Sequence, residues 1–384
     1  MNRTGVVLIL ILLGSVAGLG QGGDDVHLQI HGFATQAFAY SGANNYLGMN
    51  TAQGTTGWTE AAVNVNDQVN EKLRVGAQFH YTRLGNFGQE EPTVDWALGD
   101  YKASGLLGLR AGKVKIRWGL YNDTQDYDPG YLWALLPEPV YGIDIRSTNL
   151  SQLGVEVYGR LPIGEKFGTL SYSGYYGDYV YVSGEGEMEA FKESGLTFDS
   201  PPAGKTPGFD LRWMTPLTGL TVGGSLMMFD ATANLAGGTG TYRQPLAFWP
   251  TYYAQYINRK LFLSYQYTKL VEYQTTAITG AGTATSDSDT SAWFVMGGWH
   301  LTDKLQVGTY YTRYTLVSAA GNADPANYFH DWVASGRYDF DSNFYAKLEG
   351  HFIDGTGVGF YDFDNPNGLQ ARTNLLVGKI GFIF

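Results

Sequence analysis

The chain has 384 residues, of which 44% are hydrophobic, 15% aromatic and only 16% charged, and it contains 52 Gly and no Cys. The net charge of -11 excludes a basic face for nucleic acid, and the lack of Cys excludes disulfides, thiol catalysis and Cys-ligated zinc. The longest apolar run, 6–13, is too short to cross a bilayer as a helix, which needs about 20 residues. A Tyr- and Gly-rich β protein remains, either soluble or in an outer membrane.

The first twenty residues have the form of a secretory signal. Arg3 supplies a positive start, residues 6–13 are apolar, and Ser15-Val16-Ala17 offers the small residues of a cleavage site. We expect residues 1–20 to be a signal peptide that is cleaved near residues 17–20. The remainder, 21–384, shows no linker or second change of composition, and we expect it to form one domain.

The rest of the chain alternates between apolar and polar residues, which is the pattern of β-strands that face two environments. In residues 72–82, Val75 and Phe79 fall on one face, and Arg74 and Gln78 fall on the other. Small and aromatic residues on the apolar face suit contact with lipid. The spacing predicts sixteen strands, at residues 28–40, 58–66, 72–84, 93–103, 106–118, 152–161, 167–179, 208–215, 220–230, 244–257, 260–273, 291–301, 305–316, 328–340, 344–353 and 372–384.

The connections between these strands alternate in length. Tight turns are separated by long stretches rich in Gly, Asp and Ser, a pattern typical of transmembrane barrels with short periplasmic turns and long outer loops. The predicted fold class is therefore all-β, a sixteen-stranded antiparallel transmembrane β-barrel. The predicted long loops are residues 41–57, 119–151, 182–206, 231–242, 274–290, 317–327 and 354–371.

The last strand gives the sharpest local signal. Leu376, Gly378, Ile380, Phe382 and Phe384 form one apolar face of an alternating strand that ends the chain on Phe. This strand resembles the C-terminal strand of outer-membrane proteins, whose terminal Phe is read by the barrel assembly machinery. The resemblance implies a place in the bacterial cell outer membrane, with Phe382 and Phe384 as the assembly signal.

A barrel of sixteen strands leaves a water-filled lumen, whereas about eight strands would fill it with side chains. In the strand at 106–118, Val114 and Ile116 alternate with three cations. If the two apolar residues face lipid, the cations face the lumen. We expect six basic residues to line the pore and attract anions: Lys72, Arg74, Lys113, Lys115, Arg117 and Arg146.

The loop at 119–151 carries more aromatic and Pro residues than an exposed loop normally would. We expect it to fold inward, pack on the barrel wall and set the bore of the pore. Acidic residues on the loop could give the constriction mixed sign, so the sign of the ion selectivity stays open here, with anions favoured. The candidate constriction residues are Asp126, Asp128, Trp133, Glu138 and Asp144.

The segment Val94–Arg146 resembles a Gram-negative porin, most closely the phosphate-selective and dicarboxylate-selective porin-like group. In that group an inward third loop and basic lumen residues shape selectivity, and the resemblance also implies a homotrimer. The motifs that carry it are Asp95-Trp96-Ala97, Asp100-Tyr101, Leu109-Arg110-Ala111-Gly112-Lys113-Val114-Lys115, Gly119-Leu120-Tyr121-Asn122-Asp123 and Trp133-Ala134-Leu135-Leu136-Pro137.

The sequence thus predicts a porin for passive diffusion of small hydrophilic, preferably anionic, solutes. We expect no enzyme activity, cofactor or metal site, because no Gly-x-Ser-x-Gly motif and no metal-ligand spacing of the six His is present. Expected partners are outer-membrane lipid and lipopolysaccharide, the assembly machinery and small solutes, without nucleic acid. Two alternatives stay open: an adhesin or receptor that acts through the loops at 182–206 and 354–371, and an outer-membrane enzyme with a Ser/His/acid set near the rim.

Overall fold

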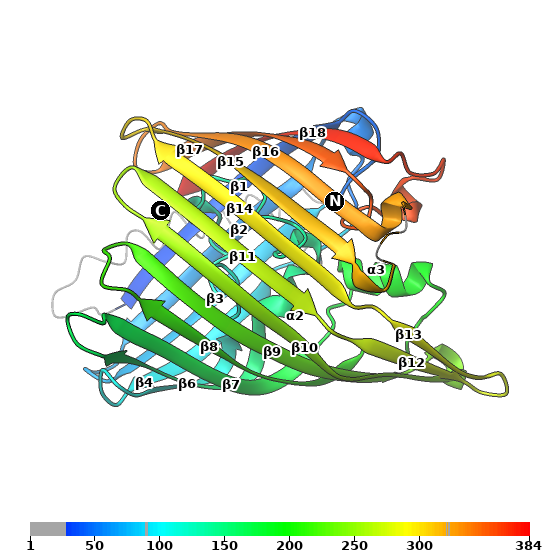
Figure 1. Cartoon of the computed structure of the whole chain (residues 1–384), viewed down its shortest axis with the longest axis horizontal. Coiled ribbons are helices and arrows are strands. Elements are labelled where there is room, and N and C mark those ends of the chain that lie inside the picture. The colour runs from blue at the N-terminus through cyan, green and yellow to red at the C-terminus, as the bar shows by residue number, and fades with distance from the viewer. Residues whose placement is uncertain (1–27, 89–90, 320, 322) are drawn as a thin grey trace.

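The computed structural model describes residues 28–88, 91–319, 321 and 323–384 (Figure 1). The predicted signal peptide lies outside the described residues. Within the described part of the chain, no helix is long and apolar enough to cross a membrane.

One antiparallel sheet of eighteen strands closes on itself through pairing of the first and last strands. Two of these, β12 and β13, form a hairpin outside the wall, since β11 pairs directly with β14. The wall therefore has sixteen strands, as predicted. They are β1 (Leu28–Ser41), β2 (Thr55–Gln68), β3 (Leu73–Leu84), β4 (Thr93–Lys102), β5 (Gly108–Lys115), β6 (Ser151–Pro162), β7 (Thr169–Val180), β8 (Ala203–Met214), β9 (Leu220–Asn234), β10 (Gly240–Ile257), β11 (Leu261–Leu270), β14 (Thr290–His300), β15 (Leu305–Leu316), β16 (Tyr328–Asp339), β17 (Phe344–Asp354) and β18 (Arg372–Ile383).

Short turns join the strands at one end of the barrel, called here the turn end, and longer connections join them at the other, the loop end. The described helices lie in the longer connections. These are α2 (Arg146–Leu150), α3 (Gly186–Glu193) and the 3-10 turns η1 (Thr51–Gln53), η2 (Asp128–Gly130), η3 (Ile143–Ile145), η4 (Ala236–Gly238), η5 (Val317–Ala319), η6 (Pro325–Asn327) and η7 (Asp362–Asp364).

The two faces of the wall differ in polarity as the alternation predicts. On β17, Leu348 and Phe352 point outward and are each 60% exposed, whereas Lys347 and Glu349 point inward and are buried. The same alternation places Val75 and Phe79 on the outside of β3. A continuous apolar outer wall suits lipid and is unsuited to water.

The stretch at 274–290 is not the irregular loop that was predicted. It forms the hairpin of β12 (Tyr273–Ile278) and β13 (Gly282–Asp287), which pairs with the start of β10 and extends beyond the wall (Figure 1). Both faces of β13 are exposed, so its Thr, Ser and Gly residues carry no apolar alternation from which a strand could be predicted.

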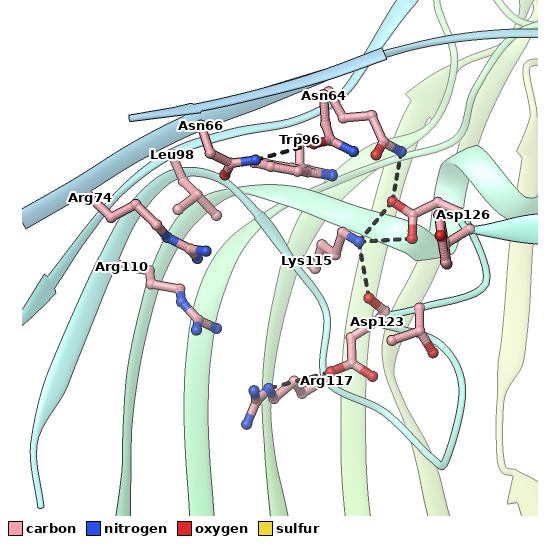
Figure 2. Close-up of a pocket in the computed structure, with 13 residues that line it drawn as sticks. Asn64, Asn66, Arg74, Trp96, Leu98, Arg110, Lys115, Arg117, Asp123 and Asp126 are labelled. Atoms are coloured by element: carbon pink, nitrogen blue, oxygen red, sulfur yellow. Dashed lines mark hydrogen bonds and ion pairs between the residues drawn. The ribbon is translucent and has the colours of Figure 1, made fainter. Parts of the chain in front are cut away.

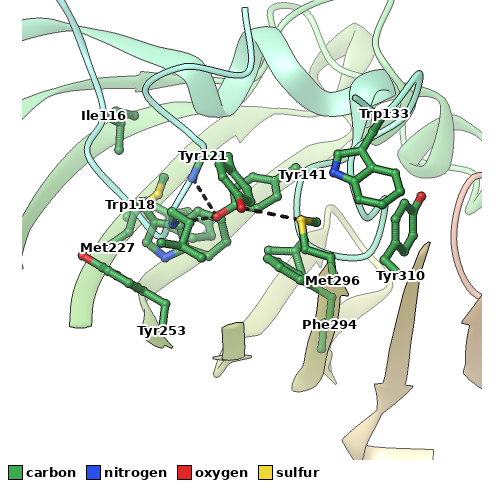
Figure 3. Close-up of a cluster of buried hydrophobic side chains, with 14 of the residues drawn as sticks. Ile116, Trp118, Tyr121, Trp133, Tyr141, Met227, Tyr253, Phe294, Met296 and Tyr310 are labelled. Carbon is green, nitrogen blue, oxygen red and sulfur yellow. Dashed lines mark hydrogen bonds between the residues drawn. The ribbon is translucent and has the colours of Figure 1, made fainter. Parts of the chain in front are cut away.

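The connection between β5 and β6, residues 116–150, folds into the barrel and is called here the inward loop. Its aromatic residues pack against the inner wall in one buried cluster (Figure 3). The Trp133 ring meets Tyr310 of β15 edge-on at 5.0 Å between centroids. The inward turn depends on Gly119, whose φ is 63° and where an added Cβ would lie 2.5 Å from the Tyr141 hydroxyl.

Candidate functional site

Two barrel lysines hold the start of the inward loop. Lys347 Nζ lies 3.0 Å and Lys379 Nζ 2.8 Å from the Asp128 carboxylate, to which the Tyr345 hydroxyl also donates at 2.6 Å. Burial alone would raise the pKa of Asp128, but the two ammonium groups hold that pKa well below its usual range. Asp128, predicted as a constriction residue, therefore acts as an anchor of the loop.

The next residues of the inward loop are held through their backbone. The Arg337 guanidinium donates to the carbonyls of Pro129 and Tyr131 at 2.5 and 2.9 Å. The Glu349 carboxylate accepts from the N–H groups of Ala134 and Leu135 at 3.0 and 2.9 Å. Charged side chains of β16–β18 thus fix residues 128–135. The loop covers these charged side chains.

On the opposite wall the inward loop leaves a cavity of about 400 Å³ near the turn end, called here the turn-side cavity (Figure 2). Figure 2 shows Arg74 and Arg110 extending from the wall toward the centre of this cavity, with Lys115 and Asp126 opposite. Lys115 Nζ is 2.7 Å from Asp126. Four basic and two acidic side chains are among its lining residues.

The wall of this cavity carries a continuous chain of ion pairs, called here the charge chain. Its four guanidinium groups and four carboxylates alternate. The N···O distances are 3.3 Å for Arg74–Asp100, 3.0 Å for Asp100–Arg110, 2.9 Å for Arg110–Glu156, 3.5 Å for Glu156–Arg117, 3.5 Å for Arg117–Asp123, 3.7 Å for Asp123–Arg212 and 2.7 Å for Arg212–Asp210.

Within the charge chain the cations are the groups that meet water. The Arg74 side chain is 45% exposed against 9% for Asp100, and Arg110 is 19% exposed against 1% for Glu156. The chain is neutral by count. Three of its carboxylates, Asp100, Glu156 and Asp210, are less exposed than the guanidinium groups, whereas Asp123 is 17% exposed and lines the cavity itself. A solute in the cavity therefore meets positive charge first.

A second cavity, of about 300 Å³, lies toward the loop end and is called here the loop-side cavity. Thr82, Thr93, Lys113, Ser147 and Glu185 are among its lining residues.

A group of buried polar side chains, called here the polar septum, lies between the two cavities. It consists of Gln78, His80, Asp95, Asp126 and Arg146, and each member is buried. Gln78 Nε2 donates to Asp126 at 2.8 Å and to Asp95 at 3.3 Å. The Arg146 guanidinium contacts both oxygens of Asp95, at 3.1 and 3.2 Å, and lies 2.8 Å from His80 Nδ1. Gln78 and Asp126 line the turn-side cavity, and the other three line the loop-side cavity.

The six predicted pore-lining cations do not form one set. Arg74, Lys115 and Arg117 line the turn-side cavity. Lys72 is exposed in the turn between β2 and β3. Arg146 lies in the septum, where Asp95 occupies its guanidinium, so it does not offer the free cation that was predicted.

The face assignment of β5 was wrong. Val114 and Ile116, predicted to face lipid, are fully buried inside, and Val114 pairs with the buried Gln152. Lys113 pairs with the outward Leu153, which is 63% exposed, yet its side chain lines the loop-side cavity, and its ammonium donates to the Val94 carbonyl at 2.6 Å. The strand ends at Lys115 rather than at 118, and beyond a strand end the alternation no longer separates lipid from lumen.

Two residues of the constriction set are buried within the packing of the loops. Glu138 accepts from the Ile143 N–H at 3.0 Å, and Asp144 accepts from the Tyr361 hydroxyl at 2.5 Å. Burial raises the pKa of both carboxyls, and for Glu138 the nearby Asp144 raises it further. Neither lines the turn-side cavity.

The sequence interpretation did not assign Arg110 or its acidic partner Asp100 to the lumen. A signal for Arg110 was present, because it alternates with Leu109 and Ala111, which are exposed on the outer face. Asp100 and Glu156 pair directly with it in the sheet register, and that register becomes known only once the strands are aligned.

The terminal aromatic residues lie at the closure of the barrel. Phe384 exchanges two backbone hydrogen bonds with Gly32 at 3.0 Å, and Phe382 packs on Phe344 with 4.8 Å between ring centroids. The bonds between Phe384 and Gly32 join the end of the last strand to β1, and the Phe382–Phe344 contact joins β18 to β17. Their role as an assembly signal remains a proposal.

Solved structures of outer-membrane proteins share this fold. An anion-selective porin from Comamonas acidovorans matches with a TM-score of 0.58 at 11% identity, over 93% of this chain and 99% of that chain. Salmonella typhi OmpF matches with a TM-score of 0.57 at 14% identity, over 93% of this chain and 97% of that chain. The outer membrane channel DcaP of Acinetobacter baumannii matches with a TM-score of 0.55 at 10% identity, over 93% of this chain and 97% of that chain. No protein-family model matches the sequence, and no curated protein matches it. The chain has the fold of an outer-membrane porin barrel.

Proposed function

We propose that this protein is an outer-membrane porin that passes small hydrophilic anions by passive diffusion. The observation that carries the proposal is that the guanidinium groups of the charge chain are more exposed than the buried carboxylates of Asp100, Glu156 and Asp210. A low-dielectric wall focuses such a field on a passing ion. The likeness to porins and channels supports the pore, and the charge chain supports the sign of its selectivity.

The inward loop and the polar septum define the solute's path in this proposal. An anion enters the turn-side cavity and meets Arg74, Arg110 and Arg117. At the septum it competes with Asp126 and Asp95 for Lys115 and Arg146. The septum thereby sets the barrier to passage, and the solute crosses when these side chains exchange partners. The proposed path requires no catalytic step and no cofactor.

The test is the reversal potential of the purified protein in a planar bilayer under a KCl gradient. We expect a stable conductance that prefers chloride. Arg74→Glu should move the reversal potential toward the cation side, because Arg74 is the most exposed guanidinium of the charge chain. The matched control is Arg259→Glu in the exposed turn between β10 and β11. Cation preference in the wild type would contradict the anionic solute and keep the pore.

The second candidate is a closed receptor or adhesin barrel that acts through its outer loops. The buried septum between the two cavities favours it. The same bilayer measurement separates the candidates, since a folded barrel without conductance would support the receptor and contradict the porin.

We also propose a homotrimer, because one matched structure of Vibrio cholerae OmpT is described as a trimer form. Light scattering in detergent tests this assembly. Residues 1–20 are proposed as a cleaved signal, and residues 21–384 as the mature domain delivered by the assembly machinery. The mass and N-terminal sequence of the exported protein test this cleavage.

A further inference from the structure

His80 is buried in the polar septum, on the inner face of β3. Its Nδ1 lies 2.8 Å from Arg146 Nη2 and 2.9 Å from the Thr82 hydroxyl. Because a guanidinium carries only donors, the contact with Arg146 requires an unprotonated Nδ1. The imidazole is then neutral and carries its proton on Nε2, which lies 3.9 Å from Glu60 Oε1.

The contact with His80 is one of three that hold the Arg146 guanidinium. The other two are the hydrogen bonds to the Asp95 oxygens at 3.1 and 3.2 Å. The backbone next to Arg146 is fixed separately, since the Glu185 carboxylate accepts from the N–H groups of residues 147–148 at 2.8 and 3.1 Å. A change at His80 therefore acts on the Arg146 side chain and leaves α2 in place.

Protonation of His80 at Nδ1 replaces the acceptor of Arg146 by a second donor. Two cations then meet at hydrogen-bond distance, where like charges repel strongly. The imidazolium has counter-charges on three elements, because His80 interacts with Glu60 on β2, Asp95 on β4 and Asp126 on the inward loop. The charged ring can thus stay in place, and the Arg146 side chain is the group that moves.

The loop-side cavity is the space into which the Arg146 side chain can move. Its volume is about 300 Å³, and Arg146 is among its lining residues. Carboxylates in the lining attract a guanidinium that turns into this space. The acidic lining residues are Glu91, Asp95, Asp144 and Glu185, and the basic ones are Lys113 and Arg146. In its new position the guanidinium adds an available cation to the path of the solute.

We propose that His80 positions Arg146 in the septum and that protonation of His80 releases this guanidinium to the solute, so that mild acid strengthens the preference of the channel for anions. This inference rests on the proposed porin function. His80 is a positioning residue in this mechanism, because the solute meets the guanidinium of Arg146 and not the imidazole.

The reversal potential of the full-length mature protein under a KCl gradient, measured between pH 8 and pH 5, tests the proposal. These are rough limits on either side of about 6.5, the usual pKa of His. As the pH falls, the ratio of chloride to potassium permeability should rise by about twofold or more, the effect of one unit charge on an ion about 10 Å away in water. His80→Gln should keep the ratio near its value at pH 8, because the amide oxygen can accept from Arg146 and the amide is not protonated in this range.

His330→Gln is the matched control. His330 lies outward on β16, since its neighbours Phe329 and Asp331 are buried inside, and this variant should respond to pH as the wild type does. Carboxylates of the outer connections are the competing explanation, because burial raises the pKa of Asp364, between β17 and β18, to about 6. A rise in the ratio that persists in His80→Gln would assign the response to such carboxylates and overturn the proposal. A wild-type ratio that does not change with pH would also overturn it.

Nitrogen-15 NMR of the imidazole groups in detergent tests the contact between His80 and Arg146 without a current. At pH 8 the His80 ring should carry its proton on Nε2, and the signal is identified by its loss in His80→Gln. A proton on Nδ1 at pH 8 would contradict the contact and overturn the proposal. If a folded barrel shows no conductance, the porin function fails, and the NMR result alone decides whether His80 positions Arg146. Unheated gel electrophoresis, in which a folded barrel keeps its own mobility, verifies that each variant is folded.

Discussion

The two sides of the lumen use the inward loop in opposite ways. Against β9–β16 the loop packs Trp118, Tyr121 and Trp133 into a buried apolar cluster. Against β2–β6 it leaves the turn-side cavity, lined by Arg74, Arg110 and Lys115. The comparison indicates that the loop moves the solute's path to one side of the barrel, where charge is concentrated. Stability and selectivity should accordingly be separable by mutation.

The largest effect is expected at the septum, between the two cavities. Arg146→Met leaves the buried Asp95 carboxylate without its bidentate partner, and removal of one member of a buried ion pair costs about 3–5 kcal/mol. Urea unfolding in lipid vesicles measures the loss. The single-channel conductance should rise at the same time, because the barrier between the cavities is removed. The double variant Arg146→Met/Asp95→Asn should recover part of the stability, and an unchanged conductance would exclude the septum as the barrier.

The next largest effect is expected where the inward loop packs against β9–β16. Trp133→Ala removes a buried ring that packs on Tyr310 and Phe262 and should cost about 3 kcal/mol or more. Trp299→Ala is the control, because Trp299 lies outward on β14 and is exposed. Urea unfolding should distinguish the two, while the reversal potential stays near that of the wild type. A large change in ion selectivity in Trp133→Ala would show that the two sides are not separable.

A smaller, pH-dependent effect is expected at Asp128. Its pKa is lower in the folded protein than in the unfolded chain because Lys347 and Lys379 offset the cost of burial. Its contribution to the free energy of unfolding is therefore complete above about pH 4, the unfolded value, and is lost as the pH falls toward the folded pKa. Urea unfolding between pH 5 and pH 3, rough limits set by that value, should show a steeper loss in the wild type than in Asp128→Asn. An equal loss of stability in the two proteins would contradict the role of Asp128 as an anchor of the inward loop.

The smallest change in stability is expected at the turn-side cavity. Arg74→Gln breaks one half-exposed ion pair with Asp100, and such pairs contribute about 0–1 kcal/mol. Urea unfolding should be nearly unchanged, although the variant should lose part of its preference for chloride. A large loss of stability would mean that the charge chain is structural.

Much of the fold could be predicted from the alternation of residues. The strand β3 has the predicted faces because each side chain there meets either lipid or the lumen. The outer strand of the hairpin, β13, could not be predicted, because its residues are exposed on both sides. At β5 the alternation was misleading. Ile116 and Trp118 are apolar because they pack inside the lumen, not because they face lipid.

The sequence by itself determined the sixteen-stranded wall, its apolar exterior and the apolar character of the inward loop, because these depend on local periodicity and composition. Only the tertiary structure decided which charges remain available to a solute. Asp95 lies far from Arg146 in the sequence and Asp128 far from Lys379, and the pairing of such residues depends on where the loop meets the wall. Arg146 and Lys379 became structural through those contacts, while Arg74, Arg110 and Arg117 face the cavity because their carboxylate partners lie behind them.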